Sequence, residues 1–207
     1  MTEGLDYYYS FRSPYSYLSA PRAFALPERF DVRLAFHGVI PMAMRGQSVP
    51  RAKRLHTLRD VAREAQRLDM PFGRIHDPIG DGAMRCLLVA QLAAAEGLIR
   101  EFVLEAGRAI WAEAIDVSSD PGLAEVCARA GLGWAHCRQA LADSALRERV
   151  EQDTAALSEL GHWGVPTLVV RGEIFWGQDR IADLEAALED AGLRRDVPPG
   201  PAFGLAG

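Results

Sequence analysis

The chain has 207 residues, of which 49% are hydrophobic and 25% charged, and its formal net charge at pH 7 is -5. Phosphate backbones and anionic lipids do not attract such an acidic chain, which argues against nucleic-acid and membrane-surface partners. No stretch approaches the roughly 18 apolar residues of a spanning helix, and Met1-Thr2-Glu3-Gly4 lacks a signal-like pattern, so we expect a cytoplasmic protein of one or two domains.

The first 40 residues are predicted to form a strand, a helix and a second strand. Residues 5–9 are rich in aromatic β formers, and residues 31–36 alternate polar and apolar side chains with the period of two expected of a strand. Residues 14–26 have a helical pattern, in which Pro14 suits the first turn and Ser13 falls at the N-cap.

The segment from Pro41 to about Leu160 is predicted to be helical throughout. Apolar residues recur at helical spacing in its successive parts: Val61, Ala65 and Leu68; Leu88, Leu92 and Ala95; Phe102, Ala106 and Ile110; Leu146, Val150, Leu157 and Leu160. One further helix is predicted to begin at Asp120 as its cap, with Pro121 in the first turn, and another covers residues 134–142.

Two short strands, residues 168–170 and 174–176, follow the helical segment. Ile181, Leu184 and Leu188 then form the apolar face of a closing helix that Gly192 ends.

This order of elements predicts an α/β chain with a thioredoxin-like fold interrupted by an all-helical insertion domain. The thioredoxin-like domain takes residues 1–40 and 161–193, and the insertion takes residues 41–160. Residues 194–207 are rich in Pro and Gly and are predicted to form a mobile tail.

Ser13-Pro14-Tyr15-Ser16 occupies the place where a thioredoxin-like chain would carry Cys-x-x-Cys. Serine hydroxyls cannot exchange disulfides as a thiolate does. A hydroxyl in front of a helix N-terminus is instead a good place to hold an anion or the thiolate of another molecule.

Cys86, Cys127 and Cys137 form no Cys-x-x-Cys pair and fall in segments predicted to be helical. We therefore expect them to be buried and inert rather than redox-active, and the sequence offers no metal site.

Three segments in order resemble the 2-hydroxychromene-2-carboxylate isomerases and the related kappa-class glutathione transferases. They are Ser13-Pro14-Tyr15-Ser16-Tyr17-Leu18, Gly164-Val165-Pro166-Thr167 and Phe175-Trp176-Gly177-Gln178-Asp179-Arg180, and Asp60-Val61-Ala62-Arg63 and Ile110-Trp111-Ala112-Glu113 also resemble family segments. The resemblance covers the chain to about Leu193.

The resemblance implies a bound glutathione whose sulfur meets Ser13. Lowering a thiol pKa from about 8.5 to about 6.5 takes roughly 2.7 kcal/mol. A hydrogen bond to a charged group supplies about 1.5 to 3 kcal/mol, and a helix N-terminus about 0.3 to 1 kcal/mol. The two together suffice, and no histidine base is required.

The resemblance also implies the other contacts of the cofactor. A cis bond at Pro166 leaves the backbone of Val165 free to pair with the cysteinyl part of glutathione. Gln178 and Asp179 grip the γ-glutamyl end, although Asp179 could also cap the last helix. Lys53, the only lysine of the chain, reaches the glycine carboxylate or the substrate, or is a solvated surface residue.

Three residues are candidates for substrate binding. His56 could carry a proton in the pocket that binds the substrate beside glutathione, and Arg85 could pair with a substrate carboxylate. Trp176 belongs to the last of the segments that resemble the family. His56 and Arg85 could equally be surface residues.

The expected activity is a glutathione-dependent cis-trans isomerisation of an aromatic unsaturated 2-oxo acid by reversible thiolate addition. A kappa-like glutathione transferase that conjugates a small electrophile needs the same sulfur, so the motifs do not separate the two. A thiol-disulfide oxidoreductase and a non-catalytic thiol-binding protein are further alternatives, and the host could use another small thiol. The resemblance is compatible with a role in the catabolism of aromatic compounds in a bacterium. It is also compatible with a homodimer.

Overall fold

Four strands form the central sheet of the protein, whose computed structural model describes residues 2–47 and 50–195. The strands are β1 (Glu3–Tyr9), β2 (Val32–Gly38), β3 (Thr167–Val170) and β4 (Glu173–Trp176), and their order in the sheet is β2-β1-β3-β4. β1 is parallel to β2, whereas β3 is antiparallel to both β1 and β4. This mixed sheet has the strands that the sequence predicts.

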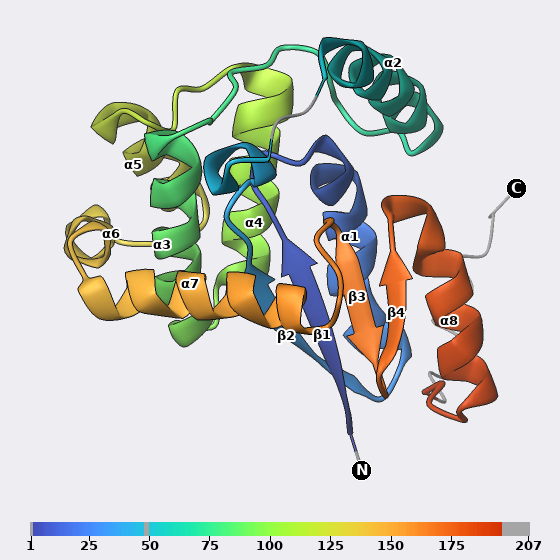
Figure 1. Cartoon of the computed structure of the whole chain (residues 1–207). Helices are drawn as coiled ribbons and strands as arrows, with labels where there is room; N and C mark the ends of the chain where they lie inside the picture. The colour runs from blue at the N-terminus through green and yellow to red at the C-terminus, as the bar shows by residue number, and fades with distance from the viewer. Residues whose placement is uncertain (1, 48–49, 196–207) are drawn as a thin grey trace, which may run out of the picture.

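Helices cover both faces of the sheet (Figure 1). In the described ranges they are α1 (Pro14–Arg29), α2 (Arg51–Arg67), α3 (Asp81–Ala95), α4 (Ile99–Arg108), α5 (Asp120–Arg129), α6 (Trp134–Leu141), α7 (Ser144–Glu159) and α8 (Ile181–Asp190). Helices α2 to α7 lie between β2 and β3 in sequence, where the insertion is predicted. Figure 1 shows α2 above the end of the sheet at which α1 begins. No helix of these ranges has the length and apolar character required to cross a membrane.

The side chains of β1 alternate between two cores. Leu5, Tyr7 and Tyr9 are fully buried in the larger core, which also contains the apolar face of α1. Tyr8 lies on the other face and packs with Leu157 of α7. Because successive side chains of a strand point to opposite faces, α1 and α7 cover opposite sides of the sheet.

The start of α5 differs by one residue from the prediction. Its N-cap is Ser119, whose Oγ accepts a hydrogen bond from the Gly122 N–H at 3.2 Å. Asp120 is therefore the first helical residue and not the cap. A serine hydroxyl is as good a cap as a carboxylate, so the sequence alone does not separate the two.

The helix predicted to run through Ile110 changes its winding before that residue. The α-helical part ends at Arg108, and Ala109–Glu113 form a π-helical turn. The indole N–H of Trp111 in this turn donates to the carbonyl of Phe11 at 3.3 Å. The turn therefore joins the helical insertion to the residues that precede Ser13.

The three cysteines, Cys86, Cys127 and Cys137, are buried and free. Burial raises the pKa of the Cys86 thiol to about 12, and it also raises the pKa values of the other two thiols. Thiols with raised pKa values hold little thiolate at neutral pH. The predicted burial is confirmed, and the raised pKa values favour the inert role.

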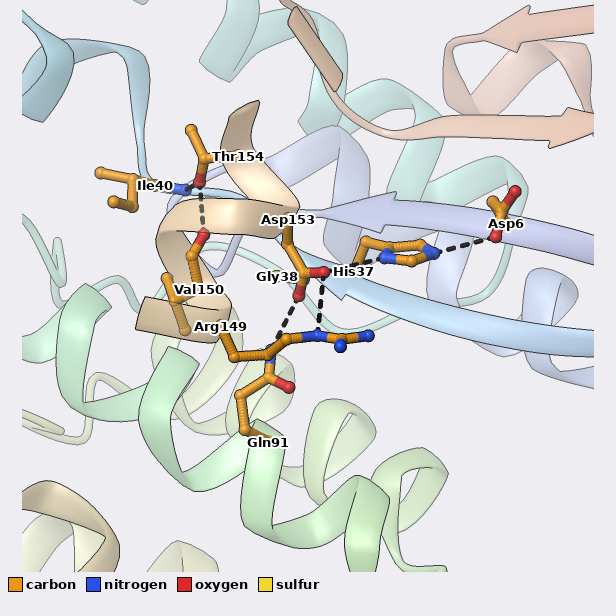
Figure 2. A network of polar contacts seen from close by, with 9 residues as sticks. All are labelled: Asp6, His37, Gly38, Ile40, Gln91, Arg149, Val150, Asp153 and Thr154. Carbon is orange, nitrogen blue, oxygen red and sulfur yellow. Dashed lines mark hydrogen bonds and ion pairs between the residues drawn. The ribbon is translucent and has the colours of Figure 1, made fainter. Parts of the chain in front are cut away.

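A buried carboxylate ties α7 to the sheet (Figure 2). Asp153 is 4% exposed. It accepts hydrogen bonds from the Gly38 N–H at 3.3 Å and from Gln91 Nε2 at 2.8 Å, and it lies 3.0 Å from His37 Nδ1. The other ring nitrogen of His37, Nε2, lies 2.9 Å from Asp6 Oδ1. The strands β1 and β2 and the helices α3 and α7 therefore meet at one polar network.

The first two residues of the predicted tail contact the end of α1. Arg194 forms a β-bridge with Phe30. The backbone N–H of Arg195 donates to the Arg29 carbonyl at 2.9 Å, and Arg195 Nε donates to the Phe30 carbonyl at 2.9 Å. The rest of the predicted mobile tail, residues 196–207, lies outside the described residues.

Candidate active site

Ser13 lies at the junction between β1 and α1. As the N-cap of α1, its Oγ accepts a hydrogen bond from the Ser16 N–H at 3.1 Å, and Pro14 is the first helical residue. The Ser13 hydroxyl donates to the carbonyl of Val165 at 3.3 Å. This contact brings the start of α1 against the segment before β3, 152 residues further along the chain.

The Val165-Pro166 peptide bond is cis, as expected from the sequence. The carbonyl of Pro166 accepts a hydrogen bond from the Gly177 N–H at 3.0 Å. The Val165 N–H, by contrast, has no hydrogen-bond partner among residues 2–47 and 50–195. An extended peptide can pair with this free backbone group as an additional strand would.

A cavity of about 990 Å³ opens beside Ser13. It lies between the start of α1, the segment before β3, the turn after β4 and the helix α2, which Figure 1 shows above this end of the sheet. Seven residues predicted from the sequence line it: Ser13, Lys53, Val165, Pro166, Trp176, Gln178 and Asp179. The fold therefore brings together residues from four separate parts of the chain.

His56 and Arg85 are not among the described residues that line this cavity. His56 is an exposed residue of α2. Arg85 of α3 forms an ion pair with Asp120 at the start of α5. The cavity thus gives no support to the substrate-binding roles predicted for these two residues.

Two tryptophans form an aromatic wall of the cavity. Trp163 and Trp176 line it, each is 51% exposed, and their ring centroids are 6.1 Å apart. A Cβ atom at Gly164 would lie 2.5 Å from Trp176 Nε1, so only glycine lets the indole pack this close to the cis bond. Large, half-exposed aromatic rings of this kind suit the binding of a flat apolar ligand.

Arg45 is a cavity residue that the sequence analysis did not identify. It lies in the 3₁₀ turn Met42–Arg45, and its Nη2 donates to the carbonyl of Trp163 at 3.1 Å. Its Nε is buried and has no partner within the described ranges. Because a buried N–H without a partner is costly, this guanidinium is a candidate binding group for an anion.

Carboxylates gather at another part of the same cavity. Asp60 and Glu64 of α2 and Asp179 of the turn after β4 all line it. The hydroxyl of Tyr15 donates to Asp60 Oδ2 at 2.6 Å. Burial raises the pKa of the Tyr15 phenol, and the negative charges of Asp60, Glu64 and Asp179 raise it further. The three carboxylates therefore lie close enough to act on the same hydroxyl group.

Asp179 does not cap the last helix. The residues Gln178–Arg180 form a 3₁₀ turn, and no side chain caps the start of α8 at Ile181. The carboxylate of Asp179 instead folds back over Gly177, where a Cβ atom would lie 2.4 Å from its Oδ1. The alternative prediction that Asp179 is an N-cap is therefore wrong.

Comparison with known proteins identifies the family. Residues 4–189 match the model of the family described as DSBA-like thioredoxin domain. The chain belongs to this family. The match spans the two thioredoxin-like segments and the helical insertion, which confirms the predicted fold.

Three similar proteins illustrate the range of relatives. A 2-hydroxychromene-2-carboxylate isomerase of Pseudomonas putida is 29% identical over 196 residues, which are 89% of this chain and 93% of the relative. A solved structure of 2-hydroxychromene-2-carboxylate isomerase has a TM-score of 0.78 at 24% identity and covers 91% of this chain, with 96% of its own chain matched. The cytosolic disulfide reductase DsbM from Pseudomonas aeruginosa with GSH has a TM-score of 0.67 at 23% identity and covers 90% of this chain and 99% of its own.

Proposed function

We propose that the protein is a glutathione-dependent isomerase that acts on an aromatic unsaturated 2-oxo acid of the 2-hydroxychromene-2-carboxylate type. The observation that carries the proposal is the Ser13 hydroxyl, which caps α1 and lies 3.3 Å from the Val165 carbonyl beside the cis-proline. The name of the Pseudomonas putida relative supports the reaction, and the GSH-bound DsbM structure supports the cofactor.

The residues of the cavity fit glutathione. This tripeptide carries one thiol, one ammonium group and two carboxylates. Ser13 offers a hydroxyl to the sulfur, the free Val165 N–H offers a donor to the peptide, and Lys53 offers a positive charge to a carboxylate. When bound, glutathione supplies a thiolate that adds reversibly to the unsaturated substrate and so permits rotation about the former double bond.

Ser13 and the start of α1 keep the sulfur deprotonated. The Ser13 hydroxyl has one proton, which it donates at 3.3 Å to the Val165 carbonyl, a long bond that can be exchanged for a bond to an anionic sulfur. The positive end of the α1 dipole acts in the same direction. Neither the hydrogen bond from Ser13 nor the α1 dipole changes covalently during the reaction, so Ser13 is unchanged at the end of each turnover.

The other walls of the cavity suit the substrate. Trp163 and Trp176 offer flat apolar surface to its aromatic ring, and Arg45 offers an unpaired N–H to its carboxylate. A wall that binds both ring and carboxylate orients the unsaturated bond toward the sulfur.

A glutathione transferase is the second candidate, because the same sulfur could form a stable adduct. Product analysis separates the two: an isomerase returns free glutathione with altered substrate geometry, whereas a transferase yields a thioether. Disulfide reductase activity is disfavoured, since hydroxyls replace the thiols at Ser13 and Ser16 and the three cysteines are buried elsewhere.

The test is turnover of 2-hydroxychromene-2-carboxylate by wild type and by Ser13→Ala, with and without glutathione. We expect dependence on glutathione and a loss of about 100-fold to 1,000-fold in kcat for Ser13→Ala, the range seen when one donor to a developing charge is removed. The control is Ser158→Ala on α7, outside the cavity lining, which should leave turnover unchanged. Turnover that needs no thiol, or an unimpaired Ser13→Ala enzyme, would refute the proposal.

A further inference from the structure

Gln178, predicted to grip the cofactor, uses its side-chain amide within the protein. The residue is 6% exposed. Its Oε1 accepts a hydrogen bond from Arg22 Nη2, and its Nε2 donates to Glu64 Oε2 at 3.3 Å. Each end of the amide therefore has a protein partner, which makes Gln178 part of the framework that supports this end of the cavity.

Arg22 of α1 holds Gln178 at two points. In addition to the side-chain contact, Nη2 of Arg22 donates to the backbone carbonyl of Gln178 at 2.9 Å. Arg22 is partly buried, and its Nε has no partner within the described part of the chain. A planar guanidinium fixed in this way sets both the main chain and the side chain of the 3₁₀ turn Gln178–Arg180.

The contacts reach two carboxylates that line the cavity, and each of them also pairs with an exposed arginine close to it in the sequence: Glu64 with Arg67, and Asp179 with Arg180 at 3.0 Å. Glu64 of α2 receives the amide of Gln178, and Asp179 is the next residue of the turn that Arg22 holds. Burial lowers the pKa of the Arg22 guanidinium, and the charges of Tyr7, Glu185, Glu64 and Asp179 oppose this shift. Positions 22, 64 and 178–179 are far apart in the sequence, so their meeting is a property of the fold.

We propose that Arg22 is a positioning residue that, through Gln178, fixes Glu64 and Asp179 as the binding site for the ammonium group of glutathione. This inference rests on the proposed function. Glutathione has a single cationic group, at its γ-glutamyl end, and an ammonium is best bound where carboxylates line the wall. Arg22 itself is not among the described residues that line the cavity.

The experiment compares two thiols by calorimetry on wild type and on Arg22→Met. N-acetylcysteinylglycine retains the cysteinyl and glycyl parts of glutathione but lacks its γ-glutamyl part, which carries the ammonium group and one of the two carboxylates. Arg22→Met should raise the Kd of glutathione by about tenfold, the size of one lost charge-assisted contact. It should change the Kd of N-acetylcysteinylglycine less than about twofold, and kcat at saturating glutathione should hold.

Arg29→Met is the matched control. Arg29 is on the same helix and makes a two-point ion pair with Glu185 of α8, at 2.7 and 2.9 Å, away from the cavity lining. Arg29→Met should change the Kd of neither glutathione nor N-acetylcysteinylglycine. Arg22→Lys, which keeps the charge but cannot reproduce the planar contact, should give an intermediate loss for glutathione alone.

A second comparison tests whether Arg22 acts through Gln178. Gln178→Leu should raise the Kd of glutathione by a similar factor. The double variant Arg22→Met/Gln178→Leu should bind glutathione no more weakly than either single variant. An equal loss for both thiols would show a merely structural role for Arg22, and unchanged glutathione binding would also overturn the inference. Failure of the wild type to bind glutathione would overturn the proposed function and this inference together.

Discussion

The cavity beside Ser13 and the network around Asp153 are both polar centres, but they differ in how completely their groups are paired. Each oxygen of Asp153 has protein partners, and both ring nitrogens of His37 face carboxylates (Figure 2). In the cavity, the Val165 N–H and Arg45 Nε have no protein partners among the described residues.

This difference separates a binding site from a structural network. A buried donor without a partner costs about 1 to 3 kcal/mol, and where such a donor lines a cavity a ligand can remove that cost by accepting its hydrogen bond. A fully paired network has nothing left to offer a ligand and instead fixes the elements that it joins. Substitutions in the two regions should therefore differ in whether they change stability or binding.

The largest effect is expected at Asp153. Asp153→Ala removes the acceptor of the Gly38 and Gln91 bonds and leaves the His37 ring facing Asp6 alone. Breaking a buried, charged network of this kind should lower the free energy of unfolding by about 3 to 5 kcal/mol. Urea denaturation followed by circular dichroism measures this loss.

Glu151→Ala is the control for Asp153→Ala, because Glu151 is an exposed residue of the same helix. It should stay within about 0.5 kcal/mol of wild type. If the two variants unfold at the same urea concentration, the Asp153 network does not stabilise the fold and the contrast with the cavity is lost.

The helices and strands could be predicted because their signals are local. Ser13 followed by Pro14 marks the start of α1, and the alternation of residues 31–36 marks β2. The Asp153 network could not be predicted, because His37 and Asp153 are 116 residues apart and each is an ordinary residue of its own element. Tertiary packing alone creates their contact.

The sequence predicted those site residues that have a distinct backbone role, such as a helix cap or a cis-proline. It could not predict residues that belong to the site only because the fold buries them beside the cavity. Ser13 and Pro166 have distinct conformational roles, and both lie where the sequence indicated. Arg45 had no such signal in the sequence, because nearly all basic residues of this chain are arginines and nothing distinguishes this one from the others. Its unpaired Nε arises only from packing against the segment that contains Trp163.

A smaller effect, on binding and not on stability, is expected at Arg45. Arg45→Met should raise the KM of the carboxylate substrate by about 10-fold to 100-fold, equivalent to roughly 1.5 to 3 kcal/mol for bonds to a charged group. Stability should change by less than about 1 kcal/mol, because removing a buried donor without a partner offsets the loss of the hydrogen bond to the Trp163 carbonyl. Steady-state kinetics and urea denaturation of the same variant give both values.

Arg51→Met is the control for Arg45→Met, because Arg51 is exposed at the start of α2 and does not line the cavity. An aromatic enone without a carboxylate should show equal KM values for Arg45→Met and wild type. A loss of stability comparable to that of Asp153→Ala would instead place Arg45 with the structural groups.

The smallest effect is a pH dependence of stability at His37. Burial alone would lower the pKa of His37, but the hydrogen bonds and charges of Asp153 and Asp6 outweigh it and raise the pKa above 6.5. Tyr8 stacks on the ring with the centroids 4.7 Å apart, and Arg149 Nε lies 3.6 Å from Asp153 Oδ1, the carboxylate oxygen that faces His37. Because the folded pKa is raised, the stabilisation is fully present below pH 6.5 and is lost as the pH rises through the folded pKa.

His37→Gln should remove this pH dependence. The difference in unfolding free energy between wild type and His37→Gln should shrink between pH 6 and pH 9, by about 1.4 kcal/mol for each unit by which the pKa is raised. Asp6→Asn, which removes the more exposed carboxylate, should reduce the change without abolishing it. A difference that grows with pH would mean that His37 is neutral in the folded protein, so the network would be held by hydrogen bonds without an ion pair.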